Sequence, residues 1–113
     1  MSKDTPKEVK KGTDGRPSKE QIAEWKGQHK ELHEIEMDGK MAIVRKPTMF
    51  DLERAMVMSK KQGAKPLDFN RNIVGNCLLF VDEGARSNDD FELWLLTSVG
   101  QFADIKEGTV KKL

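Results

Sequence analysis

Two histidines four residues apart come nearest to a metal-binding pattern in this chain. His29 and His33 have the separation found in the helical motif of zinc proteases. That motif requires a glutamate directly after the first histidine, and Lys30 stands at this position. The motif also requires both histidines on one helical face, whereas the residues after Lys30 are expected to enter a strand. We therefore expect no zinc site here.

A group of carboxylates in the second half of the chain is the other arrangement that would attract a cation. It consists of Asp82, Glu83, Asp89 and Asp90. Their spacing differs from the Asp-x-Asp-x-Asp-Gly pattern of a calcium loop. A helix N-terminus, where the dipole favours negative charge, accounts for Asp89 and Asp90. We expect no metal ion and no other cofactor.

The side chains needed for nucleophilic catalysis are also missing from the pattern. Cys77 lies within an apolar helical stretch, which predicts an inert, buried thiol. The sequence offers no Ser/His/Asp set and no glycine-rich phosphate loop after a strand. We therefore expect that the protein is not an enzyme.

Composition restricts the class of protein further. The chain has 113 residues, 35% of them charged, and a formal net charge of +1. This length suits one domain with one core. No apolar run approaches the roughly 20 residues of a membrane-spanning helix, and there is no basic excess typical of nucleic-acid binding. A single cysteine and the lack of a signal peptide predict a cytoplasmic location.

The N-terminal segment from Met1 to Pro17 is predicted to be a disordered tail of mixed charge. Its only apolar residues are Met1 and Val9, too few to offset the entropy lost on ordering. The alternative is a basic arm that binds nucleic acid or a partner. Residues 18–113 are predicted to form a single domain.

A β-hairpin is predicted around Asp38-Gly39, because both positions of a type I′ turn need φ > 0. The two-residue turn sets the pairs Met37 with Lys40, Ile35 with Ala42 and His33 with Val44. The predicted core face carries His33, Ile35, Met37, Ala42 and Val44. The predicted outer face carries Glu34, Glu36, Met41, Ile43 and Arg45.

Four helices are predicted around this hairpin. Ser18 caps a short helix ending near Gly27, which Trp25 packs onto the domain. Thr48 caps a helix over 49–61, with Met49, Phe50, Leu52, Ala55, Met56 and Val57 on its core side and Asp51, Arg54, Met58 and Lys61 opposite. A helix over 67–79 has a wide apolar arc. Ser87 caps the last helix, with Phe91, Leu95, Val99 and Phe102 on one stripe and a kink or break near Gly100.

The fold class predicted from these elements is α+β. It is a small single domain in which a β-hairpin is followed by a three-helix bundle-like layer, with a short N-terminal helix. A lone hairpin is marginally stable in water, so the helices must cover it.

The methionines suggest a site for binding another protein. Excluding Met1, all five lie between Met37 and Met58. Methionine fills irregular gaps in cores and also suits adaptable binding surfaces. Met41, Ile43 and Met58 lie on sides of their elements that otherwise carry charges, so the core does not obviously need them. We predict that these three residues contact a partner.

The order of these motifs resembles the small tail assembly chaperones of long-tailed phages and prophages. The resemblance lies in the hairpin, Arg45-Lys46-Pro47-Thr48, Leu52-Glu53-Arg54-Ala55-Met56, the helix ending in Asn76-Cys77-Leu78-Leu79, the acidic loop, and the helix with Ser98-Val99-Gly100. It spans roughly Glu31 to Leu113. Neither the 18–29 helix nor the basic tail belongs to it.

The resemblance implies a non-enzymatic role in the cytoplasm of a bacterial host. Such chaperones bind the aggregation-prone tape measure protein while tail tube subunits assemble around it, so the tape measure protein and the tail tube protein are the implied partners. It leaves a homo-oligomer open. Two alternatives remain: a virion structural or head–tail connector component, and a small nucleic-acid-binding accessory protein.

Overall fold

The hairpin forms as its turn residues predict. Asp38 and Gly39 both have positive φ, 52° and 77°. The strands β1 (Leu32–Met37) and β2 (Lys40–Arg45) pair antiparallel, with Met37 opposite Lys40, Ile35 opposite Ala42 and His33 opposite Val44. The predicted register is therefore confirmed.

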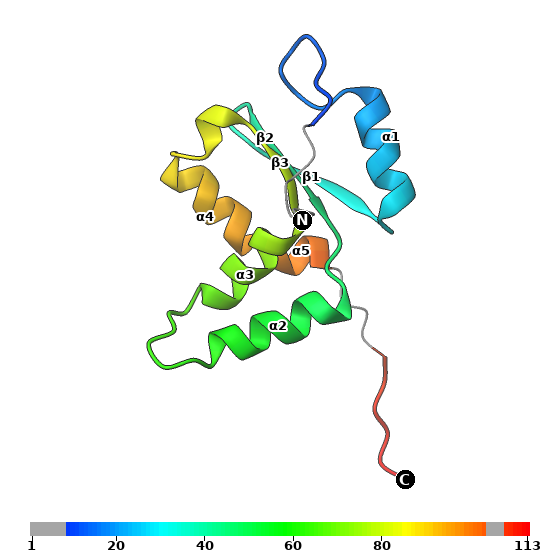
Figure 1. Ribbon diagram of the computed structural model, residues 1–113. Coiled ribbons are helices and arrows are strands. Elements are labelled where there is room, and N and C mark those ends of the chain that lie inside the picture. Colours follow the sequence, from blue (N-terminus) through cyan, green and yellow to red (C-terminus); the bar gives the residue numbers. More distant parts are fainter. Residues whose placement is uncertain (1–8, 104–107) are drawn as a thin grey trace, which may run out of the picture.

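The remaining elements complete a mixed α+β domain in the computed structural model, which describes residues 9–103 and 108–113 (Figure 1). They are α1 (Lys19–Gln28), α2 (Met49–Ser59), α3 (Asp68–Cys77), β3 (Leu78–Val81), the 3-10 helix η1 (Glu83–Ala85), α4 (Asp89–Thr97) and α5 (Val99–Ala103). The predicted α+β class is confirmed. Among the described residues, no helix is long and apolar enough to cross a membrane.

A third strand is the element that the sequence prediction lacks. The predicted 67–79 helix ends at Cys77, and Leu78–Val81 pairs antiparallel with β2 to give the sheet order β1-β2-β3. Leu79, Phe80 and Val81 suit a half-buried pleated surface, and a strand there supplies the hydrogen bonds that β2 needs on its second side. Long-range pairing therefore overrides the helical pattern.

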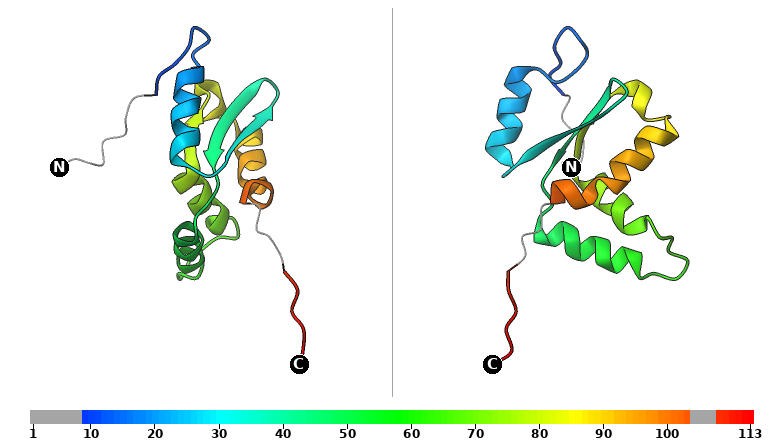
Figure 2. Two further views of the ribbon diagram at one scale, coloured as in Figure 1. Left: turned by 90° about the vertical axis from the view of Figure 1, so that its right-hand side faces the viewer. Right: turned by 180° about the vertical axis from the view of Figure 1, so that it is seen from behind.

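Helices cover both faces of this sheet (Figure 2). On the predicted core face, the larger hydrophobic cluster joins Ile35, Ala42 and Val44 to residues of α2, α3, α4 and α5. On the opposite face, α1 places Trp25 over Met41, Ile43 and Phe80 in a second cluster. The central strand β2 is therefore buried on both sides.

Most helix features agree with the prediction, although several boundaries differ. The Ser18 hydroxyl accepts the Gln21 amide at the start of α1, and Trp25 packs that helix onto the sheet, as predicted. Phe91, Leu95, Val99 and Phe102 are buried, also as predicted. The cap of α4 is Asn88 rather than Ser87, and the break before α5 falls at Ser98.

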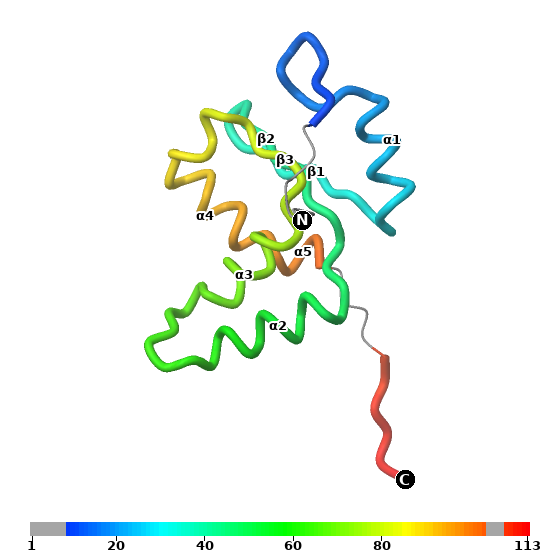
Figure 3. The backbone as a smooth tube through the Cα atoms, in the orientation of Figure 1, coloured from blue at the N-terminus to red at the C-terminus, as the bar shows by residue number. Residues whose placement is uncertain are grey.

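Residues 9–17 contact the domain, in contrast to the predicted disordered tail ending at Pro17. They form a loop closed by a bridge between Lys11 and Pro17 and joined to the start of α1 (Figure 3). The Arg16 guanidinium binds the Asp82 carboxylate, with Nη2 and Oδ2 2.8 Å apart. Residues 1–8, the rest of that predicted tail, lie outside the described residues.

Candidate protein-binding surface

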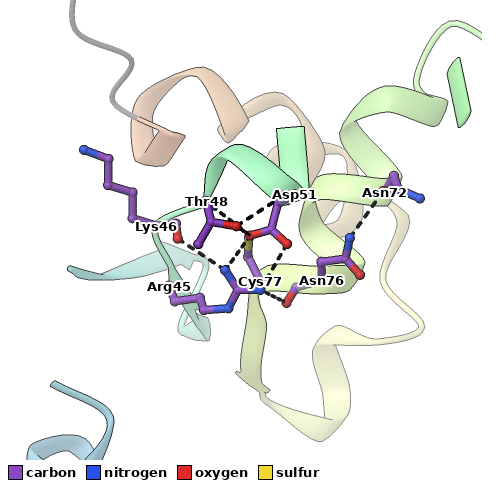
Figure 4. Close-up of polar contacts among 7 residues, drawn as sticks. All are labelled: Arg45, Lys46, Thr48, Asp51, Asn72, Asn76 and Cys77. Atoms are coloured by element: carbon purple, nitrogen blue, oxygen red, sulfur yellow. Dashed lines mark hydrogen bonds and ion pairs between the residues drawn. The ribbon is translucent and has the colours of Figure 1, made fainter. Parts of the chain in front are cut away.

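A buried ion pair fixes the start of α2 against the rest of the domain (Figure 4). Arg45, the last residue of β2, donates from Nη1 to Asp51 Oδ2 at 2.6 Å and from Nη2 to Oδ1 at 3.3 Å. Nη2 also donates to the Asn76 carbonyl near the end of α3, at 2.8 Å. One guanidinium thus ties together the end of β2, the start of α2 and the end of α3.

Asp51 is shared between this ion pair and a helix cap. Its Oδ2 accepts the Thr48 amide at 2.8 Å, while the Thr48 hydroxyl accepts the Asp51 amide, which makes a reciprocal capping box. The Arg45 hydrogen bonds, followed by those from Thr48, hold the pKa of Asp51 below its ordinary value. Burial raises the pKa of the neighbouring Cys77 thiol to about 11, which keeps it protonated.

The ion pair between Arg45 and Asp51 holds one side of α2 against the domain and leaves the other side in solvent, which corrects part of the predicted orientation of this helix. Asp51 and Ala55 face the domain and are buried, and the helix packs mainly against α3. On the side predicted to face the core, Ala55 is buried and Leu52 packs against the larger cluster, whereas Met49, Phe50, Met56 and Val57 are each 50–70% exposed. We call these four residues the α2 face.

The apolar side chains of the α2 face were assigned to the core because they outweigh the other side in hydrophobicity. The core receives Leu52 and Ala55 from the predicted side, as expected, and also Asp51 from the opposite side, whose charge is neutralised by Arg45. The hydrophobic pattern of the helix does not reveal that Asp51 is buried. The Thr48–Asp51 capping pair, read together with Arg45 just before it, was the one available indication.

The three predicted partner-contacting residues do not form one surface. Met41 and Ile43 are only 6% and 4% exposed, because α1 covers them with Trp25. Both side chains therefore belong to the core, contrary to the interpretation that the core does not need them. Met58 is exposed at the flank of α2 and belongs to neither cluster.

Charged side chains surround the α2 face. Glu53 lies within it, and Arg54, Lys60 and Lys61 are exposed along the same helix and just after it. Beside its N-terminal end lies a hollow of about 650 Å³ lined by His29, Lys30, Arg45, Lys46, Met49 and neighbours. Burial, and secondarily the nearby Arg45 guanidinium, lower the pKa of His29. Lys30, Arg45 and Lys46 therefore make the surroundings of Met49 basic.

The other residues singled out in the sequence have structural partners. Asp82 accepts the Met41 amide in addition to binding Arg16, and Asp89 begins α4. His29 caps the end of α1, whereas His33 lies on β1 with its ring 6.5 Å from that of Phe102. In the part of the chain that the structure describes, no group of three or more His, Cys, Asp or Glu side chains is placed to hold a metal ion.

Comparison with known proteins adds no relative to this description: no family model, no curated protein and no solved structure matches the chain.

Proposed function

We propose that this protein is a non-enzymatic tail assembly chaperone of a phage or prophage, which binds an apolar segment of the tape measure protein on the α2 face. The single observation that carries the binding role is the exposure of four large apolar side chains on one side of one helix. Monomeric proteins rarely leave such groups together in water without a binding function.

The chemistry of the α2 face suits a client that must be held and then released. Two of its four side chains, Met49 and Met56, are flexible and adapt to different apolar partners. The surrounding charges keep the free protein soluble and contribute little to affinity at an interface rim. A contact confined to one helix face is small, so it dissociates when tail tube subunits compete for the client.

The resemblance of residues 31–113 to tail assembly chaperones supplies the identity of the client. It places the protein in the cytoplasm of the bacterial host during assembly, with the tape measure protein as first partner and the tail tube protein as the one that displaces it. The anchored orientation of α2 supports this proposal in one further respect. Because the helix is already fixed, binding does not require its backbone to lose further conformational entropy.

The test is co-purification of the full chain with a tape measure fragment from the same genome. The double variant Phe50→Ser/Val57→Ser should bind at least about tenfold more weakly, because each residue contributes exposed apolar area to the face. Its stability should stay close to that of the wild type, since neither side chain is buried.

The matched control is Leu93→Ser/Val110→Ser, which removes two apolar side chains outside α2 that are 53% and 103% exposed. This control should bind as the wild type does. Wild-type affinity in the Phe50/Val57 variant would overturn the α2 face as the client surface. Finding the protein in purified phage particles would favour the virion structural alternative instead.

A further inference from the structure

Among the described residues, no strand pairs with the outer edge of β1. Because the order is β1-β2-β3, β1 has a neighbour on one side only. The hairpin register directs the backbone groups of His33 and Ile35 toward β2, so those of Leu32, Glu34 and Glu36 point the other way. Within the described residues, none of these outward amides or carbonyls has a hydrogen-bond partner.

A groove runs along this open edge. It has a volume of about 390 Å³, and one wall is the His33–Glu36 stretch of β1. The other wall comes from α4 and α5, with Trp94, Ser98, Gln101 and Phe102. Trp94 is 36% exposed, although so large an apolar ring would ordinarily be covered. The groove therefore combines unpaired backbone groups with the exposed ring of Trp94.

We propose that this groove binds an extended peptide segment of a partner, in which basic and apolar residues alternate, as an additional strand on β1. The backbone of such a segment would pair with the outward groups of Leu32, Glu34 and Glu36. Its side chains would point alternately to the two sides of the sheet. On the α4 side they meet Trp94, and on the α1 side they lie beside Glu34 and Glu36.

The charges on β1 select the partner. Glu34 and Glu36 are both exposed, and among the described residues neither forms an ion pair. Arg16 lies near enough to interact with Glu34, but its guanidinium is held by Asp82 and the Gly39 carbonyl. Opposite charges directly across a strand pair stabilise it, so lysine or arginine is favoured opposite each glutamate.

The same charges disfavour a second copy of this chain as the occupant. Pairing β1 with β1 of another molecule would bring Glu34 and Glu36 against the same glutamates, and like charges facing each other destabilise a strand pair. The groove is formed by β1, α4 and α5 and includes no residue of the α2 face. The proposal therefore does not depend on the proposed chaperone function.

The test uses the full chain labelled with ¹⁵N and two end-capped peptides of about seven residues. One alternates lysine with valine, and the other alternates glutamate with valine. The lysine peptide should shift the amide resonances of Glu34 and Glu36, slow their hydrogen exchange, and bind at least about tenfold more tightly than the glutamate peptide. Equal affinities, absence of binding, or shifts confined to α2 would overturn the proposal.

Two further measurements separate strand pairing from simple charge attraction. The variant Glu34→Lys/Glu36→Lys should reverse the preference in favour of the glutamate peptide, a result that a folding defect cannot produce. A lysine–valine peptide with N-methyl groups on alternate backbone nitrogens, at the pairing positions, should lose at least about tenfold in affinity. Retained affinity of the methylated peptide would mean that charge alone attracts it and would overturn the proposal. Phe50→Ser/Val57→Ser should bind as the wild type does, and a loss there would also overturn it.

Discussion

Arg45 and Asp51 form a more deeply buried ion pair than Arg16 and Asp82, whose side chains are 34% and 20% exposed. The Asp51 carboxylate is only 5% exposed, and it accepts from Thr48 as well as from the Arg45 guanidinium. Such a pair contributes less than its Coulomb attraction suggests, because both groups lose their hydration. Removing one partner is nevertheless costly, since the other charge is then left buried without compensation.

We therefore predict that Asp51→Asn lowers the free energy of unfolding by about 3 kcal/mol. The substitution keeps the shape of the side chain but removes the charge that Arg45 needs. Chemical denaturation at neutral pH measures this loss. The control is Glu53→Gln on the exposed side of the same helix, which should change stability by less than about 0.5 kcal/mol.

The pH dependence of this difference follows from the lowered pKa of Asp51. A carboxyl whose pKa is lower in the folded than in the unfolded state stabilises the fold above its unfolded pKa, near 3.9. That contribution is lost as the pH falls through the folded pKa. The stability gap between wild type and Asp51→Asn should thus be constant above about pH 5 and close at lower pH. A gap that widens on acidification would contradict the assignment.

At the residue scale, the sequence predicts which strand residues pair locally. It predicts less well which side chains are buried, because burial depends on tertiary contacts. The Asp38-Gly39 turn fixes the register by itself, and the buried arc of α3 was found by its period. Met41 and Ile43 were assigned to an exposed face because Glu34, Glu36 and Arg45 share it. Their burial depends on Trp25, whose helix comes from a distant segment and leaves no mark on the hairpin's own pattern.

At the scale of the elements, the position of α1 over the sheet is the feature that the sequence pattern does not predict. It was predicted as a helix attached through Trp25, but not as the cover of the second sheet face. Trp25 there contacts Met41, Ile43 and Phe80 from two strands, with Ile22 and Leu79 alongside. Without this helix, one side of the central strand would expose its apolar residues to water.

We predict that Trp25→Ala destabilises the domain by about 3–5 kcal/mol, as removal of a buried aromatic ring does. Lys26→Ala, on the exposed side of α1, is the control and should have little effect. Thermal or chemical unfolding followed by circular dichroism measures both. A loss below about 0.5 kcal/mol for Trp25→Ala would show that α1 does not cover the sheet in solution.

The third strand and the orientation of α2 are two features that local sequence patterns do not predict, because both depend on tertiary contacts. β3 follows α3 without a break, so no turn residue marks the change from one to the other. Its residues fit a helical arc and a strand equally, and pairing with β2 decides between them. In α2 the hydrophobic pattern predicts the burial of Leu52 and Ala55 correctly but wrongly buries the α2 face, because the ion pair with Arg45 holds Asp51 against the domain.

At the scale of the whole molecule, one strand joins two hydrophobic clusters. Val44 of β2 points into the larger cluster, while the adjacent Ile43 points into the cluster beneath α1. Both side chains are buried, and the strand that carries them is hydrogen-bonded on both sides. If β2 detached from one cluster, it would also disturb the packing of the other cluster. The two clusters should therefore unfold together.

This prediction is tested in a Trp94→Phe background, where fluorescence reports on Trp25 and hence on the smaller cluster. Far-ultraviolet circular dichroism reports mainly on the helices, most of which cover the larger cluster. The two denaturation curves should coincide, as two-state unfolding requires. Ile43→Ala should move both midpoints by the same amount, although its side chain touches only the smaller cluster. If fluorescence changed at lower denaturant than circular dichroism, α1 and its cluster would form a separate unit, and β2 would not couple the two faces.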